Sequence, residues 1–194
     1  GIVSLGRGTV VQQIYAELEA MGYTVGHKIL FAGHYGIPQM RFRTVFIGVR
    51  KYKGKISFPE PAFSAKAVAN FTGAKELCIS IPPLFYQHLK HQVGVWDALS
   101  DLPEIENRQT VSPEKYATEP QNDYQKYLRT NSDKLTAHYC ARIADVNLER
   151  LKYIPQGGSW RDIPHSLLPD GLKRARRSDH TKRYGRLHPD ALCS

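Results

Sequence analysis

The sequence predicts an α/β fold at the start of the chain, followed by a loop-rich α+β region. Three observations support this prediction. Apolar residues recur every three or four positions over 9–23, which is the period of a helix with one apolar face. Two apolar runs, 24–32 and 43–50, have the length of strands. After residue 55 the segments become short and prolines become frequent.

The first element is a helix expected over 9–23. Thr9 is a suitable N-cap because its side-chain oxygen can accept a hydrogen bond from the first turn. Gly22 is a suitable C-cap because glycine adopts the left-handed conformation without a steric cost. The apolar face of this helix is formed by Val10, Ile14, Leu18 and Met21.

Two strands and a connecting loop are expected next. The first strand covers 24–32. The second covers 43–50, and its nearly continuous apolar run is typical of a buried strand. The residues between them include Gly33, Gly36 and Pro38, which favour a loop. Helix, strand, loop and strand together indicate the last part of an α/β domain.

A domain boundary is expected near residue 55. Just beyond it, the prolines of 58–61 predict a stiff and extended exit. Two short helices are expected later in the chain, over 95–102 and 145–154, and each is followed by a proline. The region after the boundary shows no internal repeat and no low-complexity tract.

Four side chains of this later region are assigned structural roles. Trp96 lies at helical spacing from other apolar residues and is expected in the core. Trp160 could present its ring to a ligand, but packing in the core is the favoured role. Asp97 and Asp101 are expected to cap a helix and to face solvent.

Charge and cysteine content narrow the classes of function. The chain carries 27 lysines and arginines against 18 acidic residues, a formal net charge of +9. Such a balance favours a polyanionic partner, most commonly nucleic acid, although some basic proteins bind none. Three widely spaced cysteines predict neither a disulfide framework nor a zinc site, which fits a reducing intracellular, cytoplasmic location. No apolar run approaches the length that spans a membrane.

Three polar side chains alternate in the segment Gly36-Ile37-Pro38-Gln39-Met40-Arg41-Phe42-Arg43. In an extended chain, Gln39, Arg41 and Arg43 would project from one side. Two guanidinium groups and an amide then form a set of donors suited to phosphate oxygens or to the edge of a base. The alternative is a pair of arginines that bond carbonyls or carboxylates at the edge of a sheet. The residues alone leave both interpretations open.

This segment resembles the eighth conserved motif of the DNA cytosine-5 methyltransferases, because it has the pattern Gly-Ile-Pro-Gln-x-Arg-x-Arg between a helix–strand unit and an apolar strand. Further segments resemble parts of the same family in the expected order. The first is similar to the residues after the family's Glu-Asn-Val motif, and the last to the start of its ninth motif. These segments are 1–3, 58–61, 95–103, 154–160 and 184–190.

The resemblance implies a fold and a reaction. Residues 1–55 would be the tail of a Rossmann-like sheet that uses S-adenosylmethionine, 56–185 a DNA-binding target-recognition domain, and 186–194 the return to the catalytic domain. The family flips a cytosine out of duplex DNA and methylates its C5. Arg43 is then expected to hold the base O2 or a phosphate, Arg41 to anchor the local scaffold, and Gln39 to lie near the flipped base.

The resemblance also implies residues that this chain does not contain. The family's nucleophile is a cysteine that follows a proline, whereas Cys78, Cys140 and Cys193 follow leucine, tyrosine and leucine. No Glu-Asn-Val is present, and Gly6-Arg7-Gly8 lacks the preceding strand of a cofactor loop. S-adenosylmethionine is therefore expected to bind upstream of Gly1, on an N-terminal catalytic segment that acts in cis or in trans. This chain alone is expected to be inactive.

Basic residues crowd one short stretch near the end of the chain. Such density favours contacts with the phosphates of duplex DNA, which weaken steeply with salt. The alternative is a solvated charged surface. The residues concerned are Lys173, Arg174, Arg176, Arg177, Lys182, Arg183 and Arg186.

Two further functions remain open at this point. The chain could be the specificity subunit of a split methyltransferase, without catalysis of its own. It could also belong to a relative that methylates cytosine in RNA. The long insert between the eighth and ninth motifs favours DNA, and competition between duplex DNA and tRNA distinguishes these two polymers.

Overall fold

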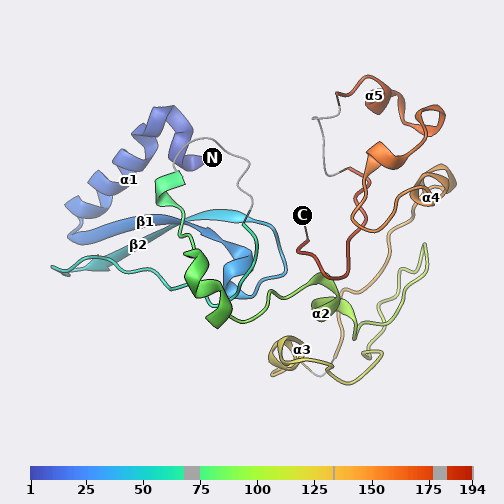
Figure 1. Ribbon diagram of the computed structural model, residues 1–194, viewed down its shortest axis with the longest axis horizontal. Coiled ribbons are helices and arrows are strands. Elements are labelled where there is room, and N and C mark those ends of the chain that lie inside the picture. Colours follow the sequence, from blue (N-terminus) through green and yellow to red (C-terminus); the bar gives the residue numbers. More distant parts are fainter. Residues whose placement is uncertain (68–74, 133, 177–182, 194) are drawn as a thin grey trace. The chain divides into compact units, whose positions relative to one another are not determined.

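The structure is a computed structural model that describes residues 1–67, 75–132, 134–176 and 183–193. The chain forms two compact units, Gly1–Gln92 and Val93–Ser194. The first unit begins with one long helix and a pair of strands (Figure 1). Its elements are η1 (Ile2–Gly8), α1 (Thr9–Ala20), β1 (Tyr23–Phe31), η2 (Ala32–Tyr35), β2 (Phe42–Arg50), η3 (Lys75–Leu77) and η4 (Pro83–His88).

The helix expected over 9–23 is confirmed as α1, and its ends differ slightly from the prediction. Gly8 is the N-cap, and Thr9 is the first helical residue. The Thr9 hydroxyl donates a hydrogen bond of 2.9 Å to the Gly6 carbonyl, so it does not cap the following turn. Gly22 follows the helix with a φ of +83°, and its N–H donates to the Glu19 carbonyl. It therefore ends the helix as expected.

β1 and β2 form an antiparallel pair, in register from Tyr23 opposite Arg50 to Phe31 opposite Phe42. Ile29 and Phe31 of β1 are buried. The expectation that the second strand is buried is wrong, because β2 is half-buried and then exposed toward its end. Side chains project from the faces of a sheet, so their burial depends on what packs over those faces, and the last three residues of β2 are left exposed.

Residues after the hairpin pack on it and belong to the same compact unit. The Ile79 N–H donates to the Ile29 carbonyl at 3.2 Å. A Cβ atom at Gly26 would lie 2.9 Å from Cβ of Ile56, so the exit segment closely covers β1. The first unit thus extends past residue 55, the boundary expected from the sequence, to Gln92. The assignment of 1–55 and 56–185 to separate functions stays a prediction.

The second unit consists of short helices and loops around one apolar cluster. Trp160 is a member of this cluster and is 5% exposed, which confirms its expected core role. The other members are Ile154, Ile163, Leu168 and Leu172. The helices are α2 (Val95–Leu99), α3 (Asp123–Leu128), α4 (Asp145–Leu151), η5 (Trp160–Asp162), η6 (His165–Leu167) and α5 (Asp170–Lys173).

The expected core position of Trp96 is wrong, since its side chain is 61% exposed. Helix α2 has only five residues, and its first turn is held by backbone bonds. The N–H groups of Val95 and Trp96 donate to the carbonyls of Ala191 and Pro189. This attachment buries Val95 and leaves the neighbouring Trp96 outside.

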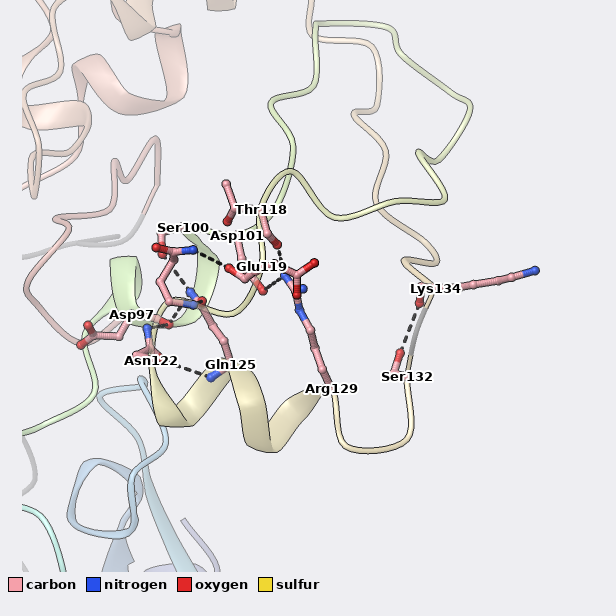
Figure 2. Close-up of polar contacts among 11 residues, drawn as sticks. Asp97, Ser100, Asp101, Thr118, Glu119, Asn122, Gln125, Arg129, Ser132 and Lys134 are labelled. Atoms are coloured by element: carbon pink, nitrogen blue, oxygen red, sulfur yellow. Dashed lines mark hydrogen bonds and ion pairs between the residues drawn. The ribbon is translucent and has the colours of Figure 1, made fainter.

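Polar groups join α2 to α3 (Figure 2). Gln125 is 1% exposed, and its amide donates to the Asp97 carbonyl and the Ser100 hydroxyl. Asp97 accepts a hydrogen bond from the Gly94 N–H, which confirms its expected capping role. Asp101 was expected to face solvent. That expectation is wrong, because Asp101 is 3% exposed and pairs with Arg129.

The mixed α/β character of the prediction is confirmed, with one two-stranded antiparallel sheet in the described part of the chain. A Rossmann-like sheet around this hairpin stays a prediction. Across the same residues, no helix combines the length and apolar character needed to cross a membrane. No cluster of potential metal ligands occurs there either.

Candidate nucleic-acid interface

The loop between β1 and β2 is held at its base by backbone hydrogen bonds. The Ala32 N–H donates to the Arg41 carbonyl at 2.8 Å, which closes the loop directly beyond the last pair of strand residues. The Ile37 N–H donates back to the Ala32 carbonyl at 3.3 Å. These two bonds fix the backbone at the point where the loop that carries Gln39 and Arg41 meets the hairpin.

The segment after the hairpin supports the first half of this loop. The His34 carbonyl accepts hydrogen bonds from the N–H groups of Ala62 and Phe63, at 2.9 and 3.1 Å. The Phe63 ring fills the space beside Gly36, where a Cβ atom would lie 2.7 Å from it. Gly36 also has a φ of +76°, which disfavours any other residue. The first half of the loop is thus packed tightly against the segment that follows the hairpin.

His34 is the most buried polar side chain of this loop, with 1% exposure. Its Nε2 lies 3.1 Å from the Ala65 carbonyl, and its ring meets the Phe31 ring edge to face. Burial lowers the pKa of His34, and the hydrogen bond to Ala65 opposes that change in part. The neutral imidazole is therefore the form that suits this site.

The three side chains singled out in the sequence lie at the end of this loop and the start of β2. Arg41 and Arg43 are exposed, and Gln39 is half-buried. Nη1 of Arg43 donates a hydrogen bond of 2.7 Å to the carbonyl of the adjacent Phe42. The three residues lie in one short segment because they are neighbours in the sequence. Their contact with a base or a phosphate stays a prediction.

The basic stretch near the end of the chain contains charges in different situations. Lys173 pairs with Asp170 at 2.8 Å, which offsets its charge. Arg174 and Arg176 are exposed. Arg177 and Lys182 lie outside the described residues. Because Lys173 is in an ion pair while the two arginines are exposed, the stretch is not a uniform binding surface.

Arg183 and Arg186 are part of the packing of the second unit. The Arg183 carbonyl accepts from the Trp160 N–H at 3.2 Å. Arg186 pairs through its backbone with Gly157 and Gly158, and its Nη1 donates to the Ile154 carbonyl at 3.0 Å. Both side chains are exposed nevertheless. A structural role and a binding role can therefore coexist at Arg186.

Residues 6–8 lie at the end of η1, directly before α1. That they bind no cofactor stays a prediction. A Cβ atom at Gly6 would lie 2.4 Å from Oγ1 of Thr9. A side chain at position 6 would therefore require the Thr9 side chain at the start of α1 to move. No catalytic step can be assigned to S-adenosylmethionine from the described residues.

Sequence reasoning missed a pocket of about 310 Å³ in the second unit. Arg161 and His188 line it together with Arg186. Arg161 was not considered as a site residue, and His188 was considered only as part of the segment 184–190 that resembles the ninth motif. The adjacent glycines at 157 and 158 were the available signal, because they allow close approach of backbone.

Comparison with known proteins gives consistent matches. The family model described as C-5 cytosine-specific DNA methylase matches residues 1–189. The chain is 33% identical over 187 residues to DNA (cytosine-5)-methyltransferase 4 of Arabidopsis thaliana, covering 88% of this chain. It is 31% identical over 208 residues to DNA (cytosine-5)-methyltransferase PliMCI of Paracentrotus lividus, covering 98%. It is 30% identical over 176 residues to the type II methyltransferase M.AgeI of Thalassovita gelatinovora, covering 89%.

These matches cover only part of each relative. The chain spans 12% of the length of the Arabidopsis and Paracentrotus proteins and 40% of M.AgeI. The matched region contains both compact units. The relatives include a type II methyltransferase.

Proposed function

The chain belongs to the family of C-5 cytosine-specific DNA methylases, and from this membership we propose that it serves as the DNA-holding part of a DNA (cytosine-5)-methyltransferase. The whole enzyme would flip a cytosine out of duplex DNA and transfer a methyl group to its C5 from S-adenosylmethionine. The observation that carries the proposal is the family match over 1–189, which includes the Gln39–Arg43 segment on its supported loop.

In the first unit, the loop after β1 supplies the groups closest to the chemistry. Arg43 holds the flipped base at O2 or a neighbouring phosphate, and Gln39 lies near the base or the gap that it leaves. Arg41 anchors the surrounding scaffold. The exposure of Arg43 supports its assignment, since a guanidinium reaches a phosphate only if solvent can reach it too.

In the second unit, the basic stretch binds the DNA backbone. We expect the exposed arginines of the stretch to contribute more than Lys173, which is paired with Asp170; among the described residues these are Arg174, Arg176, Arg183 and Arg186. The net charge of +9 supports an electrostatic contribution to binding. This unit would recognise the target sequence, in keeping with its loop-rich structure.

The nucleophile and the cofactor site would come from an N-terminal catalytic segment, in cis or in trans. None of the three cysteines follows a proline, and Gly6-Arg7-Gly8 lacks the preceding strand of a cofactor loop. The 194-residue chain is therefore expected to bind duplex DNA without methylating it. A methyl-transfer assay on the chain, with M.AgeI as the positive control, should give no signal. Sustained turnover by the chain would contradict this assignment.

Duplex binding at two salt concentrations tests the proposal. We expect fluorescence anisotropy to show binding at 50 mM salt that weakens steeply at 200 mM. A pool of random duplexes distinguishes sequence readout from general phosphate attraction, and tRNA serves as the competitor. Displacement of duplex DNA by tRNA at equal or lower concentration would favour an RNA-directed relative, and absence of duplex binding would overturn the proposal.

A further inference from the structure

A pocket of about 310 Å³ lies between two segments of the second unit, 157–161 and 185–192. The two segments are joined by a pair of backbone bonds. The Gly157 N–H donates to the Arg186 carbonyl at 2.9 Å, and the Arg186 N–H donates to the Gly158 carbonyl at 3.1 Å. The pocket is therefore framed by backbone that is held on both sides.

Close packing keeps one wall of the pocket free of a side chain. A Cβ atom at Gly158 would lie 2.7 Å from Cδ of Pro155 and 2.8 Å from Oδ2 of Asp162. The same Asp162 oxygen accepts a hydrogen bond of 2.8 Å from the Ser159 N–H. Only glycine fits between these groups, so the concave surface is built into the local fold.

The ionisable groups that line the pocket favour an anion. Arg161, Arg186 and His188 line it, and no carboxylate does so among the described residues. Arg186 uses Nη1 to bond the Ile154 carbonyl at 3.0 Å, which fixes the guanidinium in place. A guanidinium has five N–H donors. Within the described residues, Nε and Nη2 of Arg186 donate to no protein acceptor, so they can serve a bound group.

His188 adds a hydrogen-bond donor to the pocket. Nδ1 of His188 accepts a hydrogen bond of 3.2 Å from the Asp190 N–H. Because that nitrogen acts as the acceptor, the proton of the neutral ring resides on Nε2. His188 is also exposed, so a ligand can reach it. Arginine and imidazole N–H groups are the usual partners of phosphate oxygens.

We propose that this pocket binds one phosphodiester group of a DNA strand, together with its sugar. The volume lies at the lower end of the range for ligand pockets, which suits a single sugar-phosphate and not a larger molecule. The assignment of DNA as the source of the phosphodiester rests on the proposed function. The pocket would then fix the position of the second unit along the backbone and carry no sequence information.

Dimethyl phosphate tests the pocket without a polymer. We expect its titration into the ¹⁵N-labelled chain to shift the amide resonances of Gly157, Gly158 and Gly185 in a saturable way. Arg186→Gln should abolish these shifts and weaken duplex binding about tenfold. Arg142→Gln removes one charge from an exposed arginine that does not line the pocket, and it should leave the shifts unchanged.

One further variant and the duplex-binding result distinguish the possible failures. His188→Glu places a carboxylate in the pocket and should also abolish the shifts, which keeps the test valid if Arg186→Gln lowers the melting temperature. Shifts that do not saturate, or that persist in both pocket variants, would overturn the proposal that the pocket binds a phosphodiester. If the pocket saturates with dimethyl phosphate but the chain does not bind duplex DNA, the phosphodiester site stands and the proposed function fails.

Discussion

The carboxylate of Asp101 lies against the guanidinium of Arg129, and this ion pair joins the end of α2 to the end of α3 (Figure 2). Both side chains are largely buried, at 4% and 13% exposure. The guanidinium also lies 3.5 Å from the centre of the Tyr116 ring and donates to the Thr118 carbonyl. Removal of one charge would leave the other buried and unpaired, where little water can solvate it.

Asp101→Ala should therefore destabilise the second unit by about 3 kcal/mol, because it leaves the Arg129 charge unpaired. Urea unfolding followed by tryptophan fluorescence measures the change. Asp123→Ala is the matched control, since Asp123 pairs with Lys126 while fully exposed to solvent. The control should unfold at the same urea concentration as the unmodified chain. Equal midpoints for both variants would show that burial of the pair contributes nothing.

Gly36→Ala should destabilise the loop that carries Gln39 and Arg41. Two costs combine there, a positive φ and contact with the Phe63 ring. Gly22→Ala isolates the first cost, because Gly22 has a similar φ of +83° and nothing within 4 Å of the added Cβ. We expect about 1 kcal/mol for Gly22→Ala and a larger loss for Gly36→Ala, measured by thermal unfolding. Phe63→Ala in the Gly36→Ala background should recover part of the difference, and identical losses at both glycines would contradict the packing argument.

Arg43→Gln should weaken duplex binding by about ten- to a hundredfold, the range for loss of a charged hydrogen bond. Its melting temperature should stay unchanged, since the side chain is exposed and bonds only its neighbour's carbonyl within the described residues. Arg50→Gln is the control, because Arg50 is an exposed arginine at the other end of β2. Anisotropy at fixed salt compares the two. An equal loss for both variants would mean that Arg43 contributes only net charge.

Stability of the first unit should fall as the pH is lowered below about 6.5, the usual pKa of histidine. Burial lowers the pKa of His34 in the folded state, so the unfolded chain takes up its proton first. The stabilisation is complete above the unfolded pKa and is lost as the pH falls toward the folded one. His34→Gln should flatten this dependence in urea unfolding between pH 7.5 and 5. His27 also has its pKa lowered by burial, so His27→Gln accounts for the remaining slope.

The elements of the first unit were predictable because their patterns are local. The period of the apolar residues in α1 and the apolar runs in β1 and β2 each arise within a dozen residues or fewer. The burial of β2 was not predictable in this way, since it depends on which segments pack over the faces of the hairpin. Helix α2 shows the same limit, because distant carbonyls of Pro189 and Ala191 decide that Trp96 stays outside.

The sequence by itself determined the family, through motifs that keep their order along the chain, and the place of Gln39, Arg41 and Arg43 between two strands. It also determined the surplus of positive charge. Only the tertiary structure decided which charged side chains form ion pairs or hydrogen bonds within the chain. Lys173 faces Asp170, Asp101 is buried against Arg129, and Arg186 bonds a carbonyl far away in the sequence. The physical reason is that a charge acquires its role from the groups packed beside it, and most of those groups come from other segments.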